Sequence, residues 1–382
     1  MMRKFVILIL VSLVFACSKN EQTPEFALEP VDFEQIPALS DDDMLGAYNA
    51  FMRSCRKLSH RQSNTVNDNS VVQINLADYL HACSLARDII PAKFKEFVVA
   101  NFKPYLVKYK GSDQGKFTSY YEAQIRASHI RDAIYKYPIY GKPYDMIEVN
   151  LRDFDSSLPA KQLVGIIQDG KLKPYPTRAE ITAQGVNAPV VMWADDEIDV
   201  YIMQIQGSAV AIQPDGSKIR LAFAGTNGRP FKGIGSILLS KGLLTPGEAS
   251  MGNIKKWLKA NPGLAKANMD ENPRFVFHKL GNSDGPIGAQ GVPLTAGRSL
   301  AVDTDYIPLG TLLWLETSAY DGSPLNRLVV AQDIGSAIKG AIRGDYYYGS
   351  GGDEILEAAG KMNSSGRYFV LLPNHYEANN HD

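Results

Sequence analysis

Residues 331–345 of the chain read AQDIGSAIKGAIRGD. Two acids, Asp333 and Asp345, lie toward the two ends of this stretch, and three glycines interrupt it. A third acid, Asp303, ends the upstream segment RSLAVD, shortly before IPLG at residues 307–310. Carboxyl groups held on tight glycine turns can deliver or remove a proton at a fixed point. The pattern therefore favours acid–base chemistry.

Each of these acids also has a structural interpretation. Asp345 precedes the tyrosines 346–348, whose rings can desolvate a carboxyl group and raise its pKa, but an Asp after Gly also commonly caps a turn. Asp333 and Asp303 each follow an apolar run, so they either serve a site or cap the next turn. Three neighbouring acids repel one another unless they share a proton or find donors. Lys339 or the N–H groups of the glycine turns could supply these donors.

Composition and motifs narrow the chemistry. The chain has 382 residues, enough for two domains, and its formal net charge of -1 gives no reason to expect a nucleic-acid partner. No Cys/His spacing indicates zinc, and the six scattered histidines do not suggest another metal. Phosphate-loop and Gly-x-Ser-x-Gly motifs are also missing from the sequence. Glycosidic bonds break by carboxyl catalysis without a cofactor, so a sugar-cleaving site is the first hypothesis and no cofactor or metal is expected.

The N-terminus has the pattern of an export signal. Arg3 and Lys4 precede a short apolar run that ends at Cys17. We interpret residues 1–17 as a lipoprotein signal, with Cys17 lipidated as the new N-terminus, and residues 18–40 as a tether. The alternative is an ordinary signal peptide that happens to contain this cysteine. Ser18 after the cysteine favours an outer membrane lipoprotein that faces the periplasm and contacts the membrane through its N-terminal lipid.

Two further cysteines, Cys55 and Cys83, lie on helices predicted at residues 41–58 and 78–90. An exported compartment permits a disulfide between them, and two buried free thiols are the alternative.

Apolar periodicity predicts a mainly β protein with N-terminal helices. A third helix is expected at 93–102, and Pro214–Ser217 is a hairpin signal. Strands are predicted at 115–123, 199–208, 219–224, 274–279, 299–303, 310–317, 326–333 and 367–372, and helices at 235–244, 253–260 and 353–362.

Candidate binding residues lie in three segments. Gln204 and Gln206 would share one face of the strand predicted at 199–208, which runs into Gly207 and Ser208, and such amides suit sugar hydroxyl and N-acetyl groups. The alternative is the solvated face of a sheet. Tyr120 and Tyr121 offer stacking surface beside the acid Glu122, or are core aromatics. The loop 224–230, which contains Asn227, carries mixed hydrogen-bond donors.

Taken together, these motifs resemble the MltA-type membrane-bound lytic murein transglycosylases. The resemblance covers roughly residues 45–373, and the three aspartates match those of the family's C-terminal 3D domain. The matching stretches are FTSYYE (117–122), MQIQGS (203–208), AGTNG (224–228) with IG (234–235), NPRFVF (272–277), GVPLTAGRSLAVD (291–303), IPLG (307–310) and residues 331–345. Ser119 and Ala123 depart from the family pattern, which usually has Gly and Pro there; Ser119 would alter a turn where the glycan lies.

The resemblance implies a fold and a set of roles. Residues 41–122 and 281–376 would form a double-psi β-barrel domain, residues 123–280 a smaller inserted β-domain, and the groove between them would hold the glycan. Asp345 would be the catalytic acid, supported by Asp333 and Asp303. Substrate-binding residues would be Tyr120, Tyr121, Gln204, Gln206, Gly207, Ser208, Asn227 and Lys339.

The implied reaction is cleavage of peptidoglycan glycan strands between N-acetylmuramic acid and N-acetylglucosamine, with 1,6-anhydromuramoyl ends as products, for cell-wall turnover. Asp333 and Asp303 would help to hold the proton on Asp345 by like-charge repulsion. Cell-wall synthesis or division proteins are candidate partners. The alternatives are an inverting glycan hydrolase that uses Asp345 and Asp333, and a non-catalytic wall-binding barrel.

Overall fold

The structure is a computed structural model that describes residues 25–36, 43–67, 69–374 and 376. The predicted lipoprotein signal with Cys17, and residues 18–24 and 37–40 of the predicted tether, lie outside the described residues. Part of that tether is not a free linker, because Phe26–Pro30 forms strand β1 and pairs antiparallel with β2. The expectation of a tether over 25–36 was therefore wrong.

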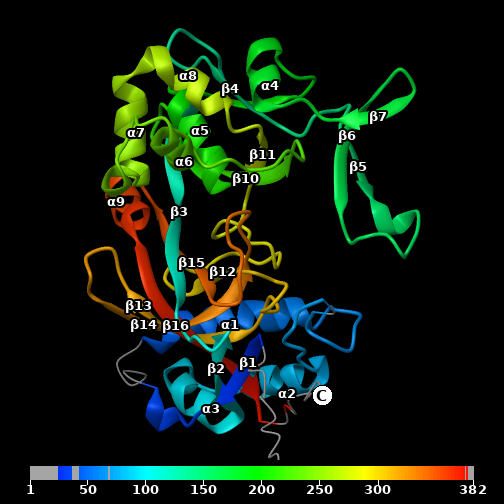
Figure 1. The fold of residues 1–382 in the computed structure, drawn as a ribbon, viewed down its shortest axis with the longest axis vertical. Coiled ribbons are helices and arrows are strands. Elements are labelled where there is room, and N and C mark those ends of the chain that lie inside the picture. The colour runs from blue at the N-terminus through cyan, green and yellow to red at the C-terminus, as the bar shows by residue number, and fades with distance from the viewer. Residues whose placement is uncertain (1–24, 37–42, 68, 375, 377–382) are drawn as a thin grey trace, which may run out of the picture.

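Helices lie at both ends of the molecule. In Figure 1, α1 to α3 lie at one end and α4 to α8 at the other. Their bounds are α1 Met44–Leu58, α2 Leu76–Arg87, α3 Phe94–Asn101, α4 Arg178–Gln184, α5 Glu197–Gln206, α6 Ile234–Ser240, α7 Met251–Ala260, α8 Pro262–Asp270 and α9 Asp353–Lys361.

Strands dominate the fold between these helical ends. Their bounds are β1 Phe26–Pro30, β2 Phe102–Tyr109, β3 Gly115–Ser128, β4 Tyr137–Tyr140, β5 Ile147–Asn150, β6 Gln162–Gln168, β7 Lys171–Pro174, β8 Val190–Ala194, β9 Ala209–Ile212, β10 Lys218–Thr226, β11 Val276–Gly281, β12 Ser299–Val302, β13 Leu312–Ser318, β14 Pro324–Asp333, β15 Arg343–Gly351 and β16 Asn363–Pro373. The protein is therefore mainly β, as the sequence predicts.

One large sheet has the strand order β1-β2-β16-β13-β14-β12-β15-β3-β9-β10-β11. Strand β16 also pairs with β3, so the pairings of β16, β13, β14, β12, β15 and β3 close on themselves. Strand β3 is the link between the two ends of the molecule, since it runs from this closed set of strands to the elements around α5 (Figure 1). Strands β5, β6 and β7 form a separate small sheet that projects to one side.

The buried apolar side chains fall into separate clusters. The largest cluster combines residues 36–117 with residues 300–372, which are distant in sequence. Three smaller clusters are built mainly from residues 121–277. The first and last parts of the chain thus share one core, and the middle part has its own.

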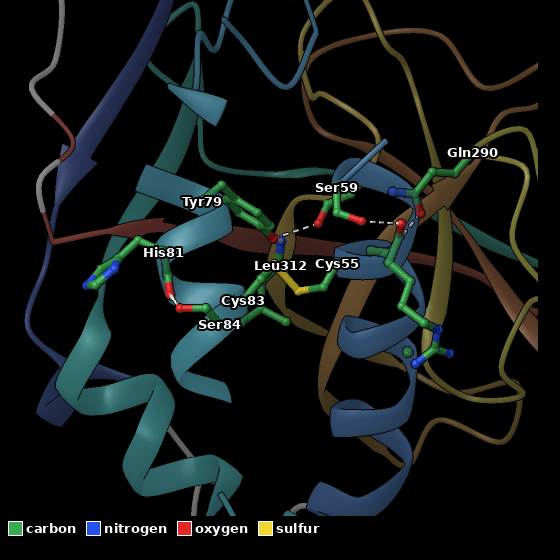
Figure 2. The surroundings of a disulfide bond; sticks show 12 residues. Cys55, Ser59, Tyr79, His81, Cys83, Ser84, Gln290 and Leu312 are labelled. Atoms are coloured by element: carbon green, nitrogen blue, oxygen red, sulfur yellow. Dashed lines mark hydrogen bonds between the residues drawn. A yellow bond between two sulfur atoms is a disulfide. The ribbon is translucent and has the colours of Figure 1, made fainter. Parts of the chain in front are cut away.

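A disulfide between Cys55 and Cys83 joins α1 to α2 (Figure 2). Helix α2 contacts the closed set of strands through Tyr79, whose hydroxyl donates to the Gly310 carbonyl at 2.6 Å and accepts from Leu312 N–H at 3.1 Å. Helix α1 begins at the N-cap Asp43, whose side chain accepts from Leu45 N–H. The helical end is thereby fixed to β13, two strands away from β12 and Asp303.

Several sequence-based expectations were wrong. The segment predicted as a strand at 199–208 is mostly helix α5, which places Gln204 and Gln206 on different faces because helical neighbours are 100° apart. Its apolar residues alternate only over a few positions, and the N-cap Asp196 begins a helix there. Asp345 lies within strand β15 and not on a turn. Strands β5 to β7 and helices α4 and α8 were not predicted.

The disulfide generates a stability prediction. The double variant Cys55→Ser/Cys83→Ser should lose about 3 kcal/mol of unfolding free energy, because the bond closes a loop of 28 residues in sequence. Urea unfolding followed by circular dichroism measures this loss. Reductant should lower the midpoint of the natural protein to that of the double variant; a midpoint that reductant leaves unchanged contradicts the prediction.

Candidate active site

Asp333 and Asp345 lie on one face of the sheet because of strand register. Ala301 of β12 pairs with Asp333 of β14 on one side and with Asp345 of β15 on the other. Asp345 in turn pairs with Thr118 of β3. Residues in register on neighbouring strands point to the same face, so the two aspartate Cα atoms are about 10 Å apart, two strand spacings. The small Ala301 side chain leaves the space between the two carboxyl groups open.

The Asp345 carboxyl group is bound on one oxygen by Thr118. The Thr118 hydroxyl donates to Asp345 Oδ1 at 2.5 Å and accepts from an Arg343 terminal nitrogen at 2.7 Å. Since Arg343 supplies one hydrogen to Thr118 Oγ1, the hydroxyl's own hydrogen points to Asp345. Burial raises the pKa of Asp345, and the charge of Asp333 raises it further, against the opposing effects of Thr118 and Arg343. Because Thr118 donates to Oδ1, Oδ2 is the oxygen of Asp345 that can carry a proton.

Asp333 is bound on both oxygens. Its Oδ2 accepts from the Tyr120 hydroxyl at 2.7 Å and its Oδ1 from Ala289 N–H at 2.9 Å. Burial raises the pKa of Asp333, whereas these two donors stabilise its carboxylate. The Tyr120 ring lies 5.3 Å from that of Tyr347, which flanks Asp345 two residues further along β15. Asp333 thus has more donors for its charged form than Asp345 does.

Asp303 is neutralised by its own partners. Its carboxylate accepts from Lys339 Nζ at 3.0 Å and from Gly340 N–H at 2.8 Å, and Gly340 has φ +118°, a backbone conformation that favours glycine. These are the donors that the sequence suggested. Asp303 is only 4% exposed and does not line the cleft described below. The expected repulsion between Asp303 and Asp345 is therefore not supported, and Asp303 fixes the loop between β14 and β15.

A cleft of about 780 Å³ opens over the two acids. One wall comes from β3, β14, β15 and the loops beside them, and the other from residues 178–279. Phe223, Ile287 and Ile334 line the cleft with side chains that are 45–52% exposed. Apolar surface beside carboxyl groups suits the flat faces and polar edges of sugar rings.

The structure brings together seven of the predicted binding residues at the cleft and separates one. Those that line the cleft are Tyr120, Tyr121, Gln204, Gln206, Gly207, Ser208 and Lys339. Tyr121 borders the cleft, but the residue is only 4% exposed and packs in the apolar core with Ala123, so little of its ring is open for stacking. Asn227 is fully buried, and its amide group bonds the carbonyls of Pro176 and Pro273 and the N–H of Phe275. Asn227 therefore holds the fold and does not line the cleft.

The two departures from the family pattern lie in strand β3. Ser119 does not occupy a turn, as was expected, and its hydroxyl donates to the Ala359 carbonyl of α9 at 2.8 Å. This bond anchors α9 against β3. Ala123 is buried and pairs with Ala209 of β9.

Sequence reasoning missed Thr118 and Arg343. Each lies two positions before a residue that the sequence analysis singled out: Thr118 before Tyr120, and Arg343 before Asp345. The period of two along a strand places them on the same face, so the signal was present once β15 was recognised. Among the described residues, no group of three or more His, Cys, Asp or Glu side chains could hold a metal ion.

Comparisons with known proteins point to one family. Residues 116–279 match the MltA specific insert domain and residues 298–372 match the 3D domain. Membrane-bound lytic murein transglycosylase A of Escherichia coli (strain K12) is 34% identical over 266 residues, 67% of this chain and 65% of that protein. The Vibrio cholerae protein of the same name is 31% identical over 273 residues, 68% of this chain and 67% of that protein. The chain thus spans about two thirds of the length of these relatives.

Solved structures agree with these matches. The monoclinic crystal form of MltA from Neisseria gonorrhoeae has a TM-score of 0.80 and 31% identity, and covers 93% of this chain and 94% of that chain. E. coli MltA with bound chitohexaose has a TM-score of 0.65 and 26% identity, and covers 92% of this chain and 95% of that chain.

The Thr118 contact generates a prediction about the pKa of Asp345. Thr118→Val should raise this pKa, because the variant loses the hydroxyl that stabilises the carboxylate. Carboxyl ¹³C NMR titration measures it, with the resonance assigned by its loss in Asp345→Asn. Ser119→Ala is the matched control, because its hydroxyl bonds α9 and should leave the pKa unchanged. An unchanged or lower pKa in Thr118→Val contradicts the assignment.

Proposed function

Because the chain belongs to the MltA family of membrane-bound lytic murein transglycosylases, we propose that it cleaves the β-1,4 bond between N-acetylmuramic acid and N-acetylglucosamine in peptidoglycan. The products carry 1,6-anhydromuramoyl ends, and the reaction serves cell-wall turnover. The observation that carries the proposal is the pair Asp345 and Asp333 on one sheet face, with the pKa of Asp345 raised by burial beneath an open cleft.

Asp345 acts first as the acid. It gives its proton to the glycosidic oxygen, the bond from that oxygen to C1 of the muramoyl sugar breaks, and a cation-like sugar remains. The C6 hydroxyl of the same sugar then attacks C1, and its proton passes to the Asp345 carboxylate. The proton on Asp345 is restored, so one carboxyl group serves as acid and then as base. Thr118 occupies Oδ1, which directs both transfers to Oδ2.

Asp333 acts as a support. Its carboxylate, held by Tyr120 and Ala289, places a fixed negative charge on the face where the cation-like sugar develops. The same charge raises the pKa of Asp345 and so favours the protonated acid. Asp303 has an indirect role, because it bonds Lys339 and Gly340 and so fixes the loop that leads into β15.

The domain division is part of the proposal. The closed path of six strands supports a double-psi β-barrel built from residues 41–122 and 281–376. The match of residues 116–279 to an insert domain, and the separate apolar clusters of this region, support an inserted domain at 123–280. The cleft lined from both parts is then the glycan groove.

The location of the protein is also proposed. The names of the relatives include the words "membrane-bound", and the sequence of residues 1–17 supports an outer membrane lipoprotein lipidated at Cys17 and facing the periplasm. No helix among the described ranges is long and apolar enough to cross a membrane. Anchoring beside the wall would also permit recruitment by cell-wall synthesis or division proteins.

Product analysis tests the reaction. Digestion of purified murein should release fragments with anhydro ends, which mass spectrometry distinguishes from hydrolysed ends by one water. Asp345→Asn should lower turnover by about 10²- to 10⁴-fold, the usual effect of losing an acid–base group. Fragments that all carry the added water support the hydrolase alternative, and murein binding without soluble fragments supports the non-catalytic one.

The role of Asp333 gives a separate prediction. Asp333→Asn should retain more activity than Asp345→Asn and should move the alkaline limb of the kcat/KM profile to lower pH. The direction follows because loss of the Asp333 charge lowers the pKa of Asp345, and the acid is active only below its own pKa. Equal losses in the two variants, with no shift of the limb, would point to the two-carboxylate mechanism of an inverting hydrolase.

A further inference from the structure

The wall of the cleft that faces the acids is basic. Residues 178–279 contribute Arg178, Arg274 and Lys279 to it, together with the amide of Gln204. We call these four residues the basic wall. The acids that line the cleft, Glu122, Asp333 and Asp345, come from β3, β14 and β15, so the basic wall contains none. The acid side also carries two cations, Lys339 and Arg343, which bond Asp303 and Thr118. The acids of the cleft all lie on the side opposite the basic wall.

Arg178 is a buried cation with an unused donor. Its guanidinium carbon lies 4.6 Å from the ring centre of Tyr201 and 5.1 Å from that of Phe275, and the residue is 4% exposed. One terminal nitrogen donates to the Arg274 carbonyl at 2.8 Å, whereas Nε has no hydrogen-bond partner among the described residues. Burial lowers the pKa of Arg178 to about 10, so it is charged at neutral pH. A buried charged donor without an acceptor is costly, which indicates that a ligand supplies one.

The other three residues of the basic wall add a hydrogen-bond acceptor and two further cations. Gln204 Oε1 is buried and has no partner within the described part of the chain, so it can accept an N–H. Arg274 is held by its Nε, which donates to the Arg229 carbonyl at 3.0 Å, and it contacts the Ser336 hydroxyl on the other side of the cleft. Lys279 is exposed at the rim. Guanidinium groups match carboxylates in shape and charge, and a glutamine oxygen beside them matches an amide N–H.

Internal acids do not satisfy Arg178. Asp270 and Glu197 lie close enough to affect the pKa of Arg178, but neither lines the cleft. Asp270 is already paired with Lys266 Nζ at 2.6 Å. Neither acid supplies an acceptor to Arg178 Nε, which has none among the described residues.

We infer that the basic wall binds the carboxylate of the substituent that distinguishes a muramoyl sugar from N-acetylglucosamine. This inference rests on the proposed function. The muramoyl lactyl group ends in a carboxyl group, which is free on a peptide-free strand and amide-linked to a peptide, with carboxylates of its own, on a peptide-bearing strand. Both sources provide a carboxylate for Arg178 and Arg274, and an acetamido or peptide N–H can donate to Gln204.

Binding to the full chain in an Asp345→Asn background tests the inference without turnover. Three ligands are titrated by calorimetry: chitohexaose, which has no carboxylate, a peptide-free muramoyl glycan, and the same glycan with peptides. The variants are Arg178→Lys, Arg274→Gln and the exposed Lys279→Gln, which does not threaten folding. Arg126→Gln is the matched control, because Arg126 lies on β3 outside the cleft and pairs with Asp195.

For Arg178→Lys and Arg274→Gln, the Kd for carboxylate-bearing glycans should rise about 10-fold, as expected when a charged hydrogen bond is lost. Lys279→Gln should raise the Kd for these glycans by a smaller factor. In all three variants the Kd for chitohexaose should change less than about twofold, well below the effect of losing one charged hydrogen bond. A rise with the peptide-free glycan assigns the lactyl carboxylate, and a rise only with peptides assigns the peptide carboxylates.

Equal losses for chitohexaose, or no loss for any ligand, would overturn the subsite. Failure of the proposed function would be visible separately, as a lack of anhydro ends from the protein with Asp345 and the basic wall intact.

Discussion

The site depends on the pairing of Ala301 with Asp333 on one side and Asp345 on the other. This register, and not the local sequence around either acid, puts both carboxyl groups on one face of the sheet. It continues to Thr118 on β3, which supplies the donor for Asp345. Gly344, next to Asp345, permits this packing, since a side chain there would meet the Phe117 ring at 2.8 Å. A shift of one residue in β15 would turn Asp345 away from the cleft.

The two walls of the cleft are joined near the acids. Strand β3 carries Glu122, whose carboxylate pairs with Arg220 of β10 at 2.9 Å and accepts from Ser350 of β15. Arg220 also bonds the carbonyl of Ser283, where the chain returns from β11. The buried ion pair between Glu122 and Arg220 thus connects strands β3 and β10, and the bond from Ser350 adds β15, the strand of Asp345. Breaking such a pair is costly, so it holds the basic wall at a set position relative to the acids.

The sequence predicted the strands that carry the acids more successfully than the surfaces around them. Apolar runs ending at Asp333 and Asp303 identified β14 and β12 because alternation and burial act locally. Strand β15 was missed, since three glycines before Asp345 suggested turns although its neighbours β12 and β3 impose an extended backbone. Helix α5 was taken for a strand because its apolar residues are nearly continuous. Tyr121 and Asn227 were assigned to the substrate because burial depends on contacts between distant segments, which spacing does not reveal.

In the proposed mechanism, Asp345 holds the reactive proton on Oδ2 while Asp333 is ionised. Neutron diffraction of a crystal with a bound glycan observes this proton directly. We expect density for deuterium on Asp345 Oδ2, a Thr118 hydroxyl directed to Oδ1, and an ionised Asp333 carboxylate that accepts from Tyr120. Deuterium on Asp333 together with an ionised Asp345 would contradict this mechanism.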